Sequence, residues 1–146
     1  MTQFKGRVLA SGTYKGKAVV SHQGVNTLAT FQSSVLAGKK KVICSDQNNK
    51  DIYNKNLTGV ALALPQTIGS TTGGMVLQVV CSMKINPACL LFSESIDSLA
   101  AAGVVLAKVW ENSNIVVIDR LGKKFLDTIK TDEDIEVKED GTVVLL

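Results

Sequence analysis

The hydrophobic pattern of the chain changes its period at Pro65. Before this point, short apolar runs of strand length are separated by glycines and polar clusters. After it, apolar residues recur at spacings of three and four: Met75, Val76, Val79, Val80 and Met83. This spacing predicts a helix over about 72–84, with these residues along one side. Proline lacks an N–H and ends strand pairing, so a β-rich first half must give way to helices here.

Four apolar runs of strand length lie in the β-rich half. They cover residues 6–12, 16–23, 40–46 and 57–65. Glycines bracket the first two runs, which is typical of a hairpin or of paired strands that close a small sheet. The polar cluster at 45–56 predicts a loop after the third run.

Helices and strands alternate in the second half. We expect strands at 85–93 and 114–119, and between them a helical segment at 95–110 that breaks at Gly103. The chain then closes with a hairpin over 130–146, whose turn dipeptide is Asp-Gly. Strands joined by helical crossovers pair in parallel, whereas hairpins add antiparallel strands. This order predicts an α/β fold with a mixed or barrel-like β core and two or three helices.

Length, charge and hydropathy exclude several classes of protein. A chain of 146 residues is the size of one domain, so we expect residues 1–146 to form a single domain. The net charge of +3 comes from 16 basic and 13 acidic residues spread along the sequence, which argues against nucleic acid as a partner. The longest apolar stretch, 99–107, is much shorter than the ~20 residues of a membrane-spanning helix. Without a signal peptide or paired cysteine spacing, a cytoplasmic location is expected.

Glycine, serine and threonine are concentrated just before the predicted helix, where residues 69–74 read GSTTGG. A helix that begins near Thr72 leaves its first N–H groups unpaired and carries a partial positive charge there. Hydroxyls and bare backbone at that end suit a carboxylate or a phosphate. The alternative is an ordinary N-cap, because serine and threonine are favoured caps. The lysine of a phosphate-binding loop is absent, and so is a G-x-G-x-x-G pattern.

Candidates for other chemistry are few. His22 is the only histidine, and no acid–base partner flanks it in the sequence. Glu94 and Asp97 lie near a predicted helix start, where carboxylates favour the helix dipole. The cysteines lie in apolar segments, which favours buried hydrophobes over metal ligands: Cys44, Cys81 and Cys89. No metal site is predicted in this chain.

Four stretches, taken in order, resemble the small subunit, or swivel domain, of the aconitase X family. They read GRVLASGTYKGKAVVS, GVALALPQTIGSTTGGMVLQ, NPACLLFSESIDSLAAAGVVLAKVW and LDTIKTDEDIEVKEDGTVVLL. The resemblance spans nearly the whole chain and implies a swivelling β/β/α domain. Residues 24–38 depart from the family, because they lack its Phe-Trp-Gly-Gly-type stretch.

Members of this family are hydro-lyases, so the resemblance implies the small subunit of a two-chain dehydratase that is inactive without its large subunit. It implies that the large subunit holds an iron–sulfur cluster and most substrate contacts. By position, Ser70 matches the serine that removes the substrate proton. The neighbouring residues of the turn are then expected to bind the substrate: Gly69, Thr71, Thr72 and Gly73.

The substrate that the resemblance implies is a small hydroxy acid. The FSESID stretch at 92–97 favours cis-3-hydroxy-L-proline, and mevalonate 5-phosphate is the alternative. Two functions outside this family stay open. One is a phosphohistidine-like swivelling module that uses His22, and the other is a stand-alone anion-binding domain that uses residues 69–74.

Overall fold

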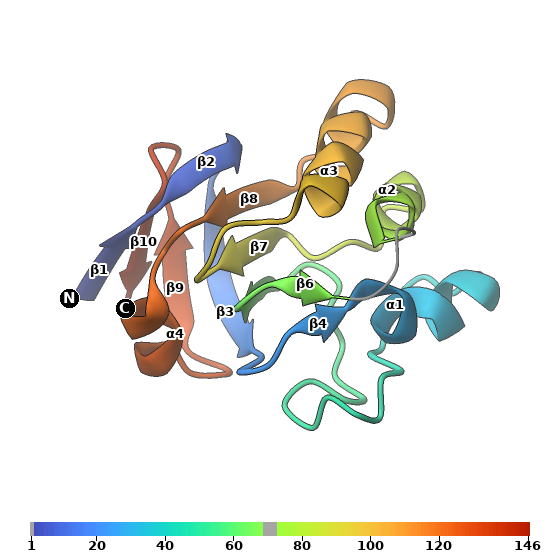
Figure 1. Cartoon of the computed structure of the whole chain (residues 1–146), viewed down its shortest axis with the longest axis horizontal. Coiled ribbons are helices and arrows are strands. Elements are labelled where there is room, and N and C mark those ends of the chain that lie inside the picture. The colour runs from blue at the N-terminus through green and yellow to red at the C-terminus, as the bar shows by residue number, and fades with distance from the viewer. Residues whose placement is uncertain (1, 69–72) are drawn as a thin grey trace.

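A computed structural model of the chain describes residues 2–68 and 73–146, and these contain ten strands and four helices (Figure 1). The strands are β1 (Thr2–Lys5), β2 (Arg7–Ala10), β3 (Tyr14–Val20), β4 (Val25–Asn26), β5 (Ala61–Leu64), β6 (Thr67–Ile68), β7 (Cys89–Phe92), β8 (Val116–Asp119), β9 (Asp134–Val137) and β10 (Thr142–Leu145). The helices are α1 (Thr27–Leu36), α2 (Gly73–Ser82), α3 (Ser98–Trp110) and α4 (Lys123–Thr128).

Eight of these strands form one mixed sheet in the order β1-β10-β9-β3-β5-β7-β8-β2. Strands β3, β5, β7 and β8 run parallel, because helical crossovers connect most of them. The remaining pairs are antiparallel, including the hairpin of β9 and β10. The expected α/β class with a mixed β core is therefore confirmed.

The sheet nearly closes into a barrel at Gly6. Strands β1 and β2 stand at opposite ends of the strand order, yet only this residue separates them in the chain. The N–H of Gly6 donates to the carbonyl oxygen of Gly141 (3.1 Å), and a side chain at position 6 would collide with the carbonyl oxygen of Asp119. A bare backbone is thus needed where the two edges meet.

Alternating residues of the parallel strands divide the interior into two clusters. In β5, Leu62 and Leu64 join the cluster beneath α1, α2 and α3, whereas Ala61 and Ala63 join the cluster inside the barrel. Phe125 of α4 fills the barrel cluster. The three longer helices therefore form a layer over one face of the sheet (Figure 1).

Several elements differ from the sequence-based expectation. The runs at 6–12 and 16–23 do not pair with each other, because β2 pairs with β8 while β3 pairs with β5 and β9. The run at 40–46 is not a strand: Ile43 makes one isolated bridge to Asn56, and the neighbouring N–H groups donate to loop atoms. Helix α3 does not break at Gly103.

Two helices, α1 and α4, were not expected. The buried side of α1 has helical spacing but is largely polar, consisting of Thr27, Thr30, Phe31 and Ser34. A search for apolar periodicity does not detect such a face. Among the helices that the structure describes, none is long and apolar enough to cross a membrane.

Candidate functional site

Two short strands bring the beginnings of α1 and α2 together. Strand β4 pairs in parallel with β6, and the N–H of Val25 donates to the carbonyl oxygen of Gln66 (2.9 Å). Helix α1 follows β4 directly, and α2 begins at Gly73 after the segment 69–72. Since each strand leads into a helix, the two helices start on the same side of the molecule (Figure 1).

Asp97 attaches the beginning of α3 to the same place. Its carboxylate is the N-cap of α3 and accepts a hydrogen bond from the N–H of Ala100 (2.9 Å). Its other oxygen accepts a hydrogen bond from the hydroxyl of Thr67 in β6. The expectation that Asp97 lies at a helix start is therefore confirmed, and the residue also links α3 to the strand that precedes the Gly-Ser-Thr turn.

The helix ends make this region favourable for negative charge. Each helix carries a partial positive charge at its N-terminus, and its first N–H groups lack intrahelical partners. Asn26 satisfies one such group in α1, because its side chain accepts from the N–H of Ala29 (3.0 Å). Asp97 already places a carboxylate at the start of α3. The start of α2 at Gly73 carries the partial positive charge that favours an anion or an alkoxide.

The candidate site residues are only partly described. Gly69, Ser70, Thr71 and Thr72 lie outside the described residues, so their roles stay predictions. Gly73 is the first residue of α2. The described residues give the framework that flanks this segment: β6 precedes it in the chain and α2 follows it, and the starts of α1 and α3 contact or pair with these elements through β4 and Asp97.

The start of α2 lies very close to α3. A side chain at Gly74 would collide with the carbonyl oxygen of Leu99, and one at Gly103 with the carbonyl oxygen of Gly74. The two glycines let the helix backbones approach, which bulkier residues prevent. This packing fixes the position of the residue that follows the turn.

The cysteines of this chain do not form a ligand set for an iron–sulfur cluster. All three are buried: Cys44, Cys81 and Cys89. Burial raises the pKa of each thiol, that of Cys89 to about 12, so the thiolate that metals require is disfavoured. Within residues 2–68 and 73–146, no group of three His, Cys, Asp or Glu side chains is placed to hold a metal ion.

His22 has a partner that local sequence does not indicate. Its ring Nδ1 lies 3.3 Å from the Oδ2 atom of Asp51, and its backbone N–H donates to the same oxygen (2.7 Å). The two residues are 29 positions apart, so no local pattern could reveal the pair. The side chain of His22 is exposed and that of Asp51 is partly exposed, and neither belongs to the framework of the turn.

Sequence reasoning also missed Thr67 and Asn26 as parts of this framework. Asn26 precedes a helix and is a favoured capping residue, which is a local signal that could have been found. The contact between Thr67 and Asp97 joins residues 30 positions apart and depends on the tertiary fold.

The chain is similar to proteins of one family over nearly its whole length. Residues 3–146 match the family described as the aconitase X swivel domain. The sequence is 28% identical to the phosphomevalonate dehydratase small subunit of Methanocella arvoryzae, over 99% of this chain and 97% of that protein. It is 26% identical to the phosphomevalonate dehydratase small subunit of Pyrococcus furiosus, over 73% of this chain and 74% of that protein.

A solved structure has the same fold. The crystal structure of Thermococcus kodakaraensis aconitase X in its holo form aligns with a TM-score of 0.82 at 20% identity, over 100% of this chain and 99% of that chain. The fold likeness and the family match agree with the resemblance found in the sequence. The chain therefore belongs to the aconitase X swivel-domain family.

Proposed function

We propose that the chain is the small subunit of an aconitase X-type dehydratase that acts on mevalonate 5-phosphate. One observation carries the proposal: the chain aligns, at 28% identity, with 97% of the length of a relative named phosphomevalonate dehydratase small subunit. Dehydration of this substrate breaks the C2–H and C3–O bonds, forms a carbon–carbon double bond and releases water. A base for the C2 proton and groups that hold the carboxylate and the phosphate are needed.

Ser70 is the base in this proposal. A serine hydroxyl is far too weak an acid to serve unless its alkoxide is stabilised, because an efficient base has a pKa near the working pH. The partial positive charge at the start of α2, whose first residue is Gly73, supports such stabilisation. Gly69, Thr71, Thr72 and Gly73 then bind the substrate.

The large subunit supplies the iron–sulfur cluster in this proposal. The donor set of this chain does not fit a cluster, since its three thiols are buried in separate parts of the chain, a loop, α2 and β7, with raised pKa values. The small subunit contributes the turn and the framework that holds it. Turnover therefore requires both chains.

A reconstituted complex tests this function. The chain and its large subunit are purified, mixed and supplied with mevalonate 5-phosphate, and formation of the conjugated alkene is followed by absorbance. Ser70→Ala is expected to lower turnover by at least ~10²-fold while leaving complex formation intact. Ser82→Ala, an exposed serine at the other end of α2, is the matched control and is expected to keep full turnover. Normal turnover by Ser70→Ala would reject the base.

A second substrate is tested in the same assay. The FSESID stretch at 92–97 favours cis-3-hydroxy-L-proline. The complex is therefore given each compound separately at equal concentration. Turnover of the proline compound, with none of mevalonate 5-phosphate, would replace the proposed substrate while keeping the reaction class.

A further inference from the structure

The helix layer presents apolar side chains to its outer side. Helix α2 lies between α1 and α3, and all three cover one face of the sheet (Figure 1). Leu36 of α1 is 77% exposed, Met75 of α2 is 66% exposed and Trp110 of α3 is 75% exposed. Exposed apolar residues that gather on one face of a protein mark an interaction surface.

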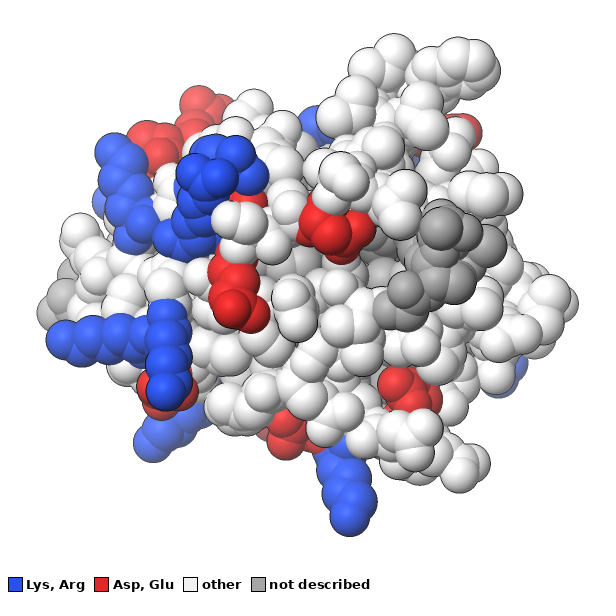
Figure 2. All heavy atoms as spheres, in the orientation of Figure 1, with Lys and Arg blue, Asp and Glu red and all other residues white. Residues whose placement is uncertain are grey.

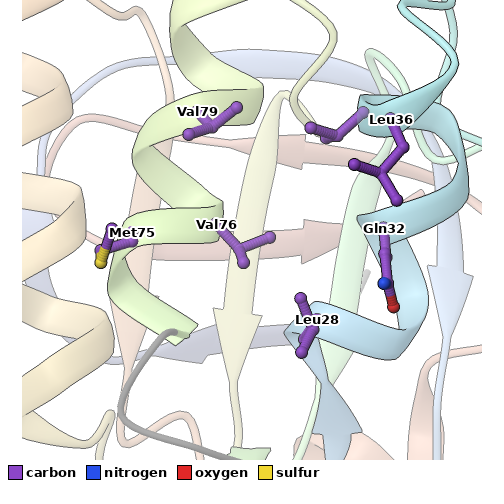
Figure 3. A pocket seen from close by; sticks show the side chains of 7 residues that line it. Leu28, Gln32, Leu36, Met75, Val76 and Val79 are labelled. Carbon is purple, nitrogen blue, oxygen red and sulfur yellow. The ribbon is translucent and has the colours of Figure 1, made fainter.

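A groove runs between α1 and α2 and has a volume of about 240 Å³ (Figure 3). In Figure 3, side chains of α1 face Val76 of α2 across it. Its lining is apolar except for one glutamine, and the main residues are Leu28, Gln32, Leu36, Met75, Val76 and Val79. We call this feature the α1/α2 groove.

Charged residues are absent from the walls of the α1/α2 groove. Neither 23–38 nor 57–83 contains an aspartate, glutamate, lysine or arginine. Figure 2 shows the same division on one face of the molecule, where charged side chains gather over the barrel strands and the helix side is mainly uncharged. The fully buried centre of a protein interface is likewise poor in charge. The matching surface must therefore be uncharged and apolar.

The groove also lies next to the candidate turn. Met75 and Val76 stand in the first turn of α2, which begins directly after residues 69–72. If the turn acts on a substrate held by another chain, that chain must reach the beginning of α2. A surface that covers the turn then continues over the groove.

We infer that the α1/α2 groove is the docking surface for an uncharged, apolar segment of the large subunit, an inference that rests on the proposed function. The relatives named small subunits belong to enzymes with a second chain, and the groove combines exposure, apolar lining and proximity to the turn. Docking there buries the exposed side chains of Leu36 and Val79. It also brings the partner to the beginning of α2.

Binding measurements on charge-insertion variants test the inference. Leu36→Glu and Val79→Glu each place a carboxylate in the groove, where burial without a partner is costly, and each is expected to raise the Kd for the purified large subunit by at least ~30-fold. Tyr53→Glu is the matched control, because Tyr53 is an exposed aromatic residue that lies outside the groove. Its Kd is expected to stay within ~3-fold of wild type.

Circular dichroism and thermal unfolding verify that each variant is folded, and Leu36→Gln provides a milder change at the same site.

The outcomes separate this inference from the proposed function. If Leu36→Glu and Val79→Glu bind the large subunit with wild-type affinity and the complex still dehydrates its substrate, the groove is not the docking surface, while the proposed function holds. If both substitutions weaken binding but the wild-type complex has no dehydratase activity, the docking surface is supported and the proposed function is rejected. A second copy of this chain is the competing occupant of the groove, and light scattering on the chain alone tests for it. A homodimer that depends on Leu36 and persists in the presence of the large subunit would overturn the inference.

Discussion

Gly74 of α2 and Gly103 of α3 lie back to back, with no room for a side chain on either. A Cβ atom at Gly103 would meet the carbonyl oxygen and the Cα atom of Gly74. Backbone atoms cannot move aside as a flexible side chain can. The contact therefore sets how closely the two helices pack, and with it the position of the residues that follow the candidate turn.

Replacing Gly103 with alanine is expected to destabilise the fold. The added methyl group must push α2 away from α3, and overpacking of this kind costs about 1–3 kcal/mol of unfolding free energy. Ala102→Gln is the control, because Ala102 is exposed on the same helix and is expected to change stability by less than ~0.5 kcal/mol. Urea denaturation followed by circular dichroism measures both variants. Equal stability of Gly103→Ala and wild type would show that the helices separate without cost.

The ion pair of Arg7 and Asp119 joins the two strands β2 and β8. The guanidinium donates to both carboxylate oxygens at 2.9 and 2.7 Å, and the N–H of Ile96 donates to the same carboxylate (2.9 Å). Burial alone would raise the pKa of Asp119, but the hydrogen bonds from Arg7 and Ile96 outweigh it and hold the pKa below its usual value. Because the folded pKa is lowered, the stabilisation is present above the usual pKa of about 3.9 and is lost as pH falls through the folded value.

Arg7→Met is therefore expected to reduce stability by about 1–3 kcal/mol near neutral pH, since a buried carboxylate loses its charged partner. The difference between wild type and variant should shrink as pH falls below about 4, because protonation of Asp119 removes the interaction from wild type as well. Unfolding free energies at several pH values between 7 and 2.5 measure this. A difference that stays constant over that range would mean that Asp119 does not carry the effect.

Much of the fold could be predicted because its signals are local. The strands within 57–65, 85–93 and 114–119 are short apolar runs with turn residues at their ends, and the terminal hairpin has an Asp-Gly turn. Pairing partners could not be predicted in the same way. Strands β2 and β3 are neighbours in the chain, yet they do not pair with each other: β2 pairs with β8, and β3 pairs with β5 and β9.

The site shows the same division between local and distant information. A carboxylate near a helix start is a local signal, and Asp97 caps α3 as expected. Its second contact, to Thr67, depends on how β6 lies against α3 and has no counterpart in the sequence pattern. The role of Ser70 came from the family resemblance, because composition alone also fits an ordinary cap.

The buried thiols are expected to resist modification in the folded chain. Burial raises the pKa of Cys89 to about 12, so very little thiolate is present at pH 8. Labelling by a disulfide reagent should be at least ~100-fold slower in buffer than in urea, where all three thiols become accessible. Mass spectrometry after partial labelling identifies the modified residue. Rapid labelling of Cys89 in buffer would contradict the closed packing of β7.

The hydrogen bond from Thr67 to Asp97 is expected to position the turn without contributing to partner binding. Thr67→Val removes the hydroxyl but keeps the shape of the side chain, so the hydrogen bond from β6 to the cap of α3 is lost. If the framework holds Ser70 in place, turnover of the reconstituted complex should fall by about 10-fold or more, because small misplacements of a reacting group are costly. The Kd for the large subunit should stay unchanged.

Thr128→Val, which removes a comparable hydroxyl hydrogen bond in α4, serves as the control and should retain full turnover. Unchanged turnover in Thr67→Val would show that the turn keeps its position without this bond, whereas an equal loss in both variants would point to a general effect on stability.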